Sequence, residues 1–270
     1  MLIGCGYDIA YECNADTPMM LQLHLRPERH GDLTTIERFA VLPYAPYRSY
    51  RDGFGNVCTR LVMPAGVTRF TCDFVIRDSG LPDLAPEGAR QVDVKDLPDD
   101  VLIYLLGSRY CDTDKLATLA WSLFRDVAPG WPRVKAICDY THDRIVFGYK
   151  DARADRTAFE AHEERVGVCR DFAHLAIALC RCMNIPARYC TGYLGDIGIP
   201  PDGNPMDFSA WFDVYLDHRW HTWDARHNHP RIGHILMARG RDATDAAIST
   251  AFGSATLVNF TVTTDEIHET

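Results

Sequence analysis

A cysteine at the start of a predicted helix is the residue of this chain best suited to nucleophilic chemistry. Cys169 lies in the run Gly167–Ala173, and apolar residues then recur three and four positions apart, at Phe172, Leu175, Ala176, Leu179 and Met183. This spacing predicts a helix with one buried face, which Asn184–Pro186 ends. The positive end of a helix dipole favours thiolate over thiol. We therefore expect Cys169 to be a nucleophile whose thiol pKa is lowered.

The chain has 10 cysteines, and most of them are explained more simply as small buried apolar side chains. Two fall in or beside the buried face of the same helix, and five lie in strand-like runs. We interpret these seven as structural: Cys180 and Cys182, then Cys5, Cys13, Cys58, Cys72 and Cys190. These thiols and the histidines offer metal ligands, but no C-x-x-C pair occurs. We expect no metal and no other cofactor.

About forty residues after Cys169 come two runs that mix aromatic and β-branched residues, Asp207–Leu216 and Arg219–Asp224. Asp217 and His218 separate the runs, so they predict a β-hairpin. A cysteine at a helix start followed by an aspartate at a strand end resembles the transglutaminase-like core, a papain-related fold. In that family a G-x-C-x-(D/E) helix start carries the thiol, an H-A-W strand start carries the base, and a W-x-x-D strand end carries the carboxylate that orients the base.

The resemblance spans about Trp131 to Asp242 and is closest to bacterial proteins of the family that have an N-terminal β-region. It implies that Cys169 attacks an amide carbonyl of a protein or peptide, that its backbone N–H contributes to the oxyanion hole, and that Asp224 orients the base. The acyl group would then pass to water or to an amine, with hydrolysis slightly favoured. The alternative for Asp224 is a residue that caps a turn.

One departure from the family pattern concerns the base, because the H-A-W element here reads Ser209–Ala210–Trp211. At neutral pH a serine cannot take the thiol proton, stabilise a thiolate as an imidazolium does, or protonate the leaving amine. Either another histidine supplies the ring, or the site is impaired. An impaired site would leave a peptide-binding or scaffolding module.

Among the 11 histidines, His227 is the leading candidate for this base. It follows Asp224 by three residues, so a turn after the strand would bring its ring back toward the carboxylate. His221 points to the opposite face of the strand, His174 lies about 140° around the helix from the thiol, and His229 is further along the chain. A structural histidine is the alternative for each.

The chain divides near residue 80, and the pattern predicts an α+β fold. Residues 1–80 contain strand-like runs such as Tyr7–Cys13 and Val57–Met63, which indicate an antiparallel β-sandwich. Residues 81–98 form a linker, and residues 99–270 form a transglutaminase-like core of helices packed on an antiparallel sheet. Helices are predicted at about 99–106, 113–124 and 132–144, and a capping box opens another at Thr157. The alternating tail Ala255–Thr263 predicts a final strand, which we expect to join the core sheet.

Composition bounds the partners and the location of the protein. A chain of 270 residues with 47% apolar residues can bury a substantial core. The net charge of −9 argues against nucleic acid or an anionic membrane as the main partner. We find no membrane-spanning run and no secretory signal at the start. Ten cysteines in such a chain predict reduced thiols and a cytoplasmic location. The oligomeric state is left open.

Overall fold

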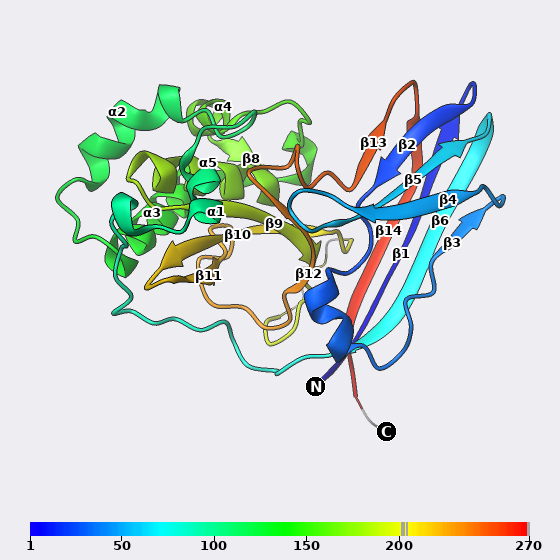
Figure 1. The fold of residues 1–270 in the computed structure, drawn as a ribbon, viewed down its shortest axis with the longest axis horizontal. Coiled ribbons are helices and arrows are strands. Elements are labelled where there is room, and N and C mark those ends of the chain that lie inside the picture. Colours follow the sequence, from blue (N-terminus) through cyan, green and yellow to red (C-terminus); the bar gives the residue numbers. More distant parts are fainter. Residues whose placement is uncertain (201–202, 204, 269–270) are drawn as a thin grey trace.

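The computed structural model describes residues 1–200, 203 and 205–268, which form a β-sandwich and a core domain side by side (Figure 1). The sandwich has two four-stranded sheets, ordered β14-β1-β6-β3 and β13-β2-β5-β4. Apolar side chains from both sheets share one core. Six strands come from the N-terminal region: β1 Leu2–Cys13, β2 Thr17–Leu21, β3 Ala40–Leu42, β4 Tyr47–Arg51, β5 Val57–Met63 and β6 Gly66–Arg77. The predicted antiparallel β-region is therefore present.

The C-terminal tail completes this sandwich, so its predicted place in the core sheet is wrong. Strand β13 (Ser249–Ala251) pairs with β2, and β14 (Thr256–Ile267) pairs with β1 along almost its whole length. Figure 1 shows β14 beside β1. Without β14, the long strand β1 would be an edge with unpaired backbone groups. Alternation in a sequence predicts a strand but carries no information about its partner.

Within the described residues, the core domain combines five helices with a four-stranded antiparallel sheet ordered β11-β10-β9-β12. This arrangement confirms the predicted α+β class. The strands are β9 Ala187–Tyr193, β10 Ser209–Leu216, β11 Arg219–Trp223 and β12 Ile235–Gly240. The helices are α1 Asp99–Leu102, α2 Thr113–Phe124, α3 Trp131–Arg144, α4 Ala158–Glu164 and α5 Cys169–Cys182, and the short strands β7 Val146–Phe147 and β8 Val166–Gly167 pair in parallel. Short 3-10 turns lie at Pro27–Asp32, Val94–Asp96, Ile103–Leu105 and Tyr149–Asp151.

Helix α5 is the centre of the core domain and is buried on all sides, whereas its sequence predicted one buried face. Every residue from Asp171 to Arg181 is buried. Helices α2, α3 and α4 cover the side that does not face the sheet. The polar side chains of α5 can be buried because they form hydrogen bonds. For example, the Arg181 guanidinium donates to the backbone oxygens of Leu106, Ala187 and Arg241.

The predicted hairpin is formed by β10 and β11, and its turn explains its register. Asp217 and His218 both have positive φ, at 45° and 60°, as a two-residue type I′ turn requires. Leu216 therefore pairs with Arg219, and Phe212 pairs with Trp223. As a result, the first residues of β10 and the residues that follow β11 meet at one end of the sheet.

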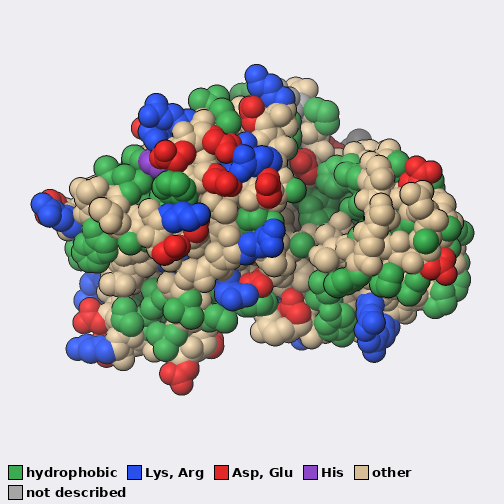
Figure 2. All heavy atoms as spheres, turned by 90° about the horizontal axis from the view of Figure 1, so that it is seen from above, with side chains coloured by type: hydrophobic (Ala, Val, Ile, Leu, Met, Phe, Trp, Pro, Cys, Tyr) green, Lys and Arg blue, Asp and Glu red, His purple; other side chains and the backbone are tan. Residues whose placement is uncertain are grey.

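The linker segment, residues 79–98, crosses the core sheet on the side away from α5 and holds only one short 3-10 turn (Figure 1). The backbone N–H of Asp83 donates to the Arg231 oxygen, and its carboxylate accepts from the Arg231 N–H and from Nδ1 of His234. Between the two parts the surface is hollowed, and hydrophobic side chains lie in the hollow (Figure 2). Within the described part of the chain, no helix is long and apolar enough to cross a membrane.

We predict that removing residues 256–270, which deletes β14, lowers the thermal midpoint by on the order of 10 °C or more, because β1 loses its partner and Val262 leaves the sandwich core. Circular dichroism during heating measures this change. Removal of residues 268–270 alone, which leaves β14 intact, is the control and should change the midpoint little. Equal midpoints for the two truncations would contradict the pairing.

Candidate active site

Cys169 is the first residue of α5, and a buried carboxylate fixes this helix start. Oδ2 of Asp171 accepts the Val168 N–H at 2.9 Å, so the side chain in the first turn satisfies a backbone donor ahead of the helix. The same oxygen accepts from the Arg156 guanidinium at 3.0 Å. Both Arg156 and Asp171 are buried, so the pair holds the chain that leads into Cys169.

Gly167 leaves the room that this carboxylate needs. A Cβ atom at position 167 would lie 2.7 Å from both Cβ and Oδ2 of Asp171, a distance that real Cβ atoms essentially never show. The glycine and the acidic residue on either side of Cys169 are therefore coupled by packing. The spacing that the sequence displays around Cys169 is a steric requirement of this helix start.

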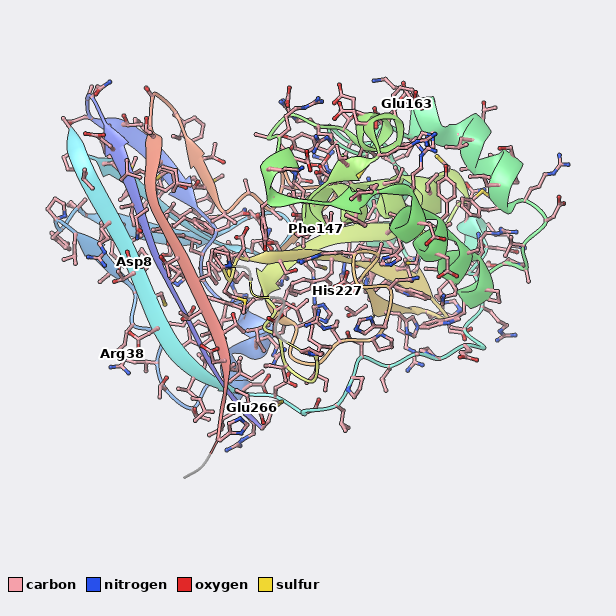
Figure 3. All side chains as sticks on the ribbon, turned by 180° about the vertical axis from the view of Figure 1, so that it is seen from behind. Asp8, Arg38, Phe147, Glu163, His227 and Glu266 are labelled. Carbon is pink, nitrogen blue, oxygen red and sulfur yellow. The ribbon has the colours of Figure 1, made fainter. Side chains whose placement is uncertain are left out.

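The structure brings three of the predicted site residues into one pocket. Cys169, Ser209 and His227 all line a cavity of about 30 Å³, and Asp224 lies behind His227. Nδ1 of His227 is 2.6 Å from Oδ2 of Asp224, and the His227 backbone N–H donates to Oδ1 at 3.0 Å. Figure 3 marks His227 in the core domain, together with Phe147, which also contacts the neighbouring residue Arg226. The turn after β11 thus folds back as expected.

The electrostatics of the pair fix the orientation of the ring. Burial by itself would raise the pKa of Asp224, but the hydrogen bonds and the charge of His227 outweigh burial and hold the pKa at about 2. An ionised carboxylate only accepts hydrogen bonds, so Nδ1 of His227 carries the hydrogen. Nε2 is then the nitrogen available as a base.

Helix α3 holds the turn that carries His227. Nδ2 of Asn228, which has a φ of 55°, donates to Oδ1 of Asp139 at 2.7 Å. Nδ1 of His142 lies 2.8 Å from the backbone oxygen of Arg226 and donates to it. The turn is therefore bound on both sides of His227 by side chains from a helix about ninety residues earlier.

The sandwich helps to place the other wall of the pocket. Phe208, which precedes Ser209, packs its ring edge-on against Tyr7 of β1 and Phe260 of β14, with centroid distances of 6.0 and 5.9 Å. The backbone oxygen of Ser209 also accepts from the Thr191 hydroxyl at 2.9 Å. The start of β10 is thus anchored in both parts of the molecule.

Ser209 lies in the pocket but has no means to act as the base. Its side chain is buried, and its hydroxyl has no hydrogen-bond partner among the described residues. The remaining candidate histidines lie elsewhere. His221 is buried against Trp131, and His174 stacks on Tyr110. His229 is exposed, and its Nδ1 donates to the backbone oxygen of His227. None of these three lines the thiol pocket.

The predicted low pKa of the thiol is wrong for this structure. Burial, and after it the charge of Asp207, raise the pKa of Cys169, while Arg226 and the Ala210 backbone N–H lower it, and the net result is a pKa of about 11. The helix dipole stabilises a negative charge at the helix start by about 1 kcal/mol or less when that charge is exposed. Removing water from around a thiolate costs more free energy than this, so burial determines the direction in which the pKa of the thiol shifts.

Four charged residues of the pocket were not predicted as site residues from the sequence: Asp196, Asp207, Arg226 and Arg231. Arg231 is only 2% exposed. Its guanidinium donates to the Gly195 oxygen at 2.8 Å. A charged residue in a loop is normally exposed, and nothing in the local pattern signals otherwise. The residues that the structure describes contain no group of three or more potential metal ligands.

Comparison with known proteins gives a consistent result. Residues 117–225 match the family model of the transglutaminase-like superfamily, a span that includes Cys169, Ser209 and Asp224. His227 lies two residues beyond its end. An uncharacterized protein of Mycobacterium leprae is 34% identical over 86 residues, which is 30% of this chain and 30% of that relative, so the alignment spans less than a third of either protein.

Two solved structures extend the comparison. A protein of Cytophaga hutchinsonii, proposed to be a cysteine protease, has a TM-score of 0.86 and 30% identity, over 100% of this chain and 92% of that chain. The periplasmic domain of TgpA from Pseudomonas aeruginosa has a TM-score of 0.40 and 13% identity, over 82% of this chain and 89% of that chain. The first of these likenesses covers both the sandwich and the core domain.

We predict that Asp224 stabilises the fold in a pH-dependent way. Its pKa of about 2 lies below the ordinary value of 3.8, so its charge adds stability that is present above about pH 4 and is lost as the pH falls through 2. Denaturant unfolding should place Asp224→Asn below the wild type at pH 7 by on the order of 2 kcal/mol, with the gap closing near pH 2. A gap of equal size at both pH values would contradict this. The exposed Asp93→Asn is the control and should show no gap.

Proposed function

The chain belongs to the transglutaminase-like superfamily, and from this premise we propose that it is a thiol enzyme that cleaves or transfers an amide-linked acyl group through Cys169. The substrate is a protein or peptide, and the scissile bond is a peptide or isopeptide bond. The observation that carries the proposal is the pocket that Cys169 and His227 both line, with the His227 ring hydrogen-bonded to Asp224.

The first half of the reaction forms an acyl-enzyme. Nε2 of His227 takes the proton from the Cys169 thiol as the sulfur attacks the amide carbonyl carbon. The carbonyl oxygen becomes negative, and the backbone N–H of Cys169 is a donor for it, since an N–H in the first helical turn has no acceptor within the helix. The imidazolium then gives its proton to the amine nitrogen, the C–N bond breaks, and a thioester remains.

The second half regenerates the thiol. Water or an amine attacks the thioester carbon while His227 removes a proton from it, and the proton returns to the sulfur as the C–S bond breaks. Asp224 stays ionised through the cycle and stabilises the imidazolium form of His227. Hydrolysis is the default outcome because water reaches any open pocket, and transfer requires that an amine outcompete it.

One observation favours a second candidate, an impaired domain that binds peptides without cleaving them. Ser209 occupies the family's base position, and burial raises the pKa of the Cys169 thiol to about 11. A thiol of this kind reacts slowly unless His227 takes its proton during the attack. The two candidates differ in whether Cys169 becomes acylated, so intact-protein mass spectrometry after incubation with activated peptide esters separates them.

We predict that Cys169→Ala abolishes amide cleavage and acyl transfer and leaves the thermal midpoint nearly unchanged, because the nucleophile is lost while only one sulfur atom is removed from the edge of the core. Suitable readouts are the release of p-nitroaniline from peptide anilides and the incorporation of a fluorescent amine into casein. Cys182→Ala, a change at a half-buried cysteine outside the pocket, is the matched control and should keep its activity. Activity that survives in Cys169→Ala would refute the assignment of the nucleophile.

We predict that His227→Ala lowers the rate by on the order of a hundredfold or more, the usual scale for loss of a positioned acid or base. Ser209→Ala should cost little, because this hydroxyl transfers no proton. His229→Ala removes an exposed neighbouring imidazole and serves as the control. In the His227→Ala background, Ser209→His should restore activity if position 209 still faces the sulfur. A fully active His227→Ala variant would show that His227 is not the base of the reaction.

A further inference from the structure

The thiol pocket contains a carboxylate to which the mechanism gives no role. Asp207 lies two residues before Ser209 and lines the same cavity as Cys169 and His227. The cavity has a volume of about 30 Å³, so it is small. The anchoring of Phe208 in the sandwich core fixes the backbone next to Asp207.

Within the described residues, the Asp207 carboxylate forms no ion pair within 4.0 Å. The pocket wall also includes Asp196 and two cationic residues, Arg226 and Arg231. The Arg226 guanidinium lies over the Phe147 ring, 3.7 Å from its centroid, and the Arg231 guanidinium donates to the Gly195 oxygen. The charge of Arg226 still acts on Asp207 and partly offsets the effect of burial on its pKa.

A carboxylate at this place works against the chemistry of the free site. Burial raises the pKa of Asp207 itself, and the charge of Asp207 raises the pKa of the Cys169 thiol. A negative neighbour disfavours a thiolate, so the free enzyme has a less reactive thiol than the same pocket without Asp207. A cation placed beside the carboxylate would reverse this effect.

We propose that Asp207 is a specificity-determining residue that selects peptides carrying a cationic side chain next to the scissile amide. The bound cation is distinct from the amine that leaves, and it stays in place while the amide reacts. The size of the cavity favours a compact ammonium group over a planar guanidinium. When the ammonium neutralises Asp207, the thiolate forms more readily, so recognition and activation are coupled. This inference rests on the proposed function, since it assumes that peptides enter this pocket.

The test uses small thiol reagents that differ in charge, so that it does not depend on turnover. Wild-type protein is treated with the cationic 2-aminoethyl methanethiosulfonate, the anionic 2-sulfonatoethyl methanethiosulfonate and the neutral methyl methanethiosulfonate. Mass spectrometry of the peptide that contains Cys169 gives each rate. We expect the cationic-to-anionic rate ratio to fall by about tenfold in Asp207→Asn, the size expected when one charged partner is lost.

Three further variants and reagents sharpen the outcome. Asp207→Glu keeps the charge and should keep most of the cationic preference. Asp93→Asn changes the net charge equally at an exposed position, 76% exposed, and should leave the ratio unchanged. The neutral reagent should react faster with Asp207→Asn, because the thiol ionises more easily. An unchanged cationic preference in Asp207→Asn, or an equal loss in Asp93→Asn, would overturn the proposal.

Failure of this proposal and failure of the proposed function give different results. A protein that never cleaves amides can still show the charge preference at Cys169, in which case the pocket selects cations without catalysis. If the enzyme is active but shows no charge preference, the proposed mechanism stands and the role of Asp207 in substrate selection is refuted. With an active enzyme, peptides with lysine or norleucine beside the scissile amide should differ by about tenfold in kcat/KM, and Asp207→Asn should remove the difference.

Discussion

The buried Asp224 carboxylate and the His227 imidazole are joined by a 2.6 Å contact, and the surrounding structure is arranged so that this contact can form. A carboxylate in such a place is costly unless it is paired and hydrogen-bonded. The hairpin delivers Asp224 at a strand end, α3 holds the following turn through Asp139 and His142, and the linker segment binds the loop at Arg231. Elements from three distant parts of the chain therefore hold one pair of side chains.

This arrangement brings an imidazole into a pocket whose wall has a serine at position 209. In an antiparallel hairpin, the start of one strand lies beside the end of the other, so Ser209 and the residues after Asp224 reach the same end of the sheet. A ring that arrives from beyond β11 can thus face the pocket that a ring at the start of β10 would face. Proton transfer depends on where the nitrogen lies, and its position in the chain does not matter.

The two parts of the molecule are not independent with respect to this site. Phe208 belongs to the core domain, yet it packs with Tyr7 and Phe260 in the sandwich, directly beside Asp207 and Ser209. The sandwich in turn needs both ends of the chain, because β14 pairs with β1. The thiol in the resulting pocket is protonated at rest, since burial and Asp207 oppose ionisation. A thiol that stays protonated is oxidised slowly, because oxidation follows thiolate character and exposure.

Local patterns in the sequence determined much of this protein. Periodicity, capping and turn chemistry act over a few residues, and they predict four features correctly: the helix at Thr113–Phe124, the capping box at Thr157, the start of α5 at Cys169 and the hairpin turn. The return of His227 toward Asp224 was also predictable, because the two are three residues apart. Only the tertiary structure decided that β14 joins β1, that Arg231 is buried, and that the pKa of Cys169 is raised. Strand partners, burial and desolvation depend on segments that pack from elsewhere in the chain, and a local pattern carries no information about them.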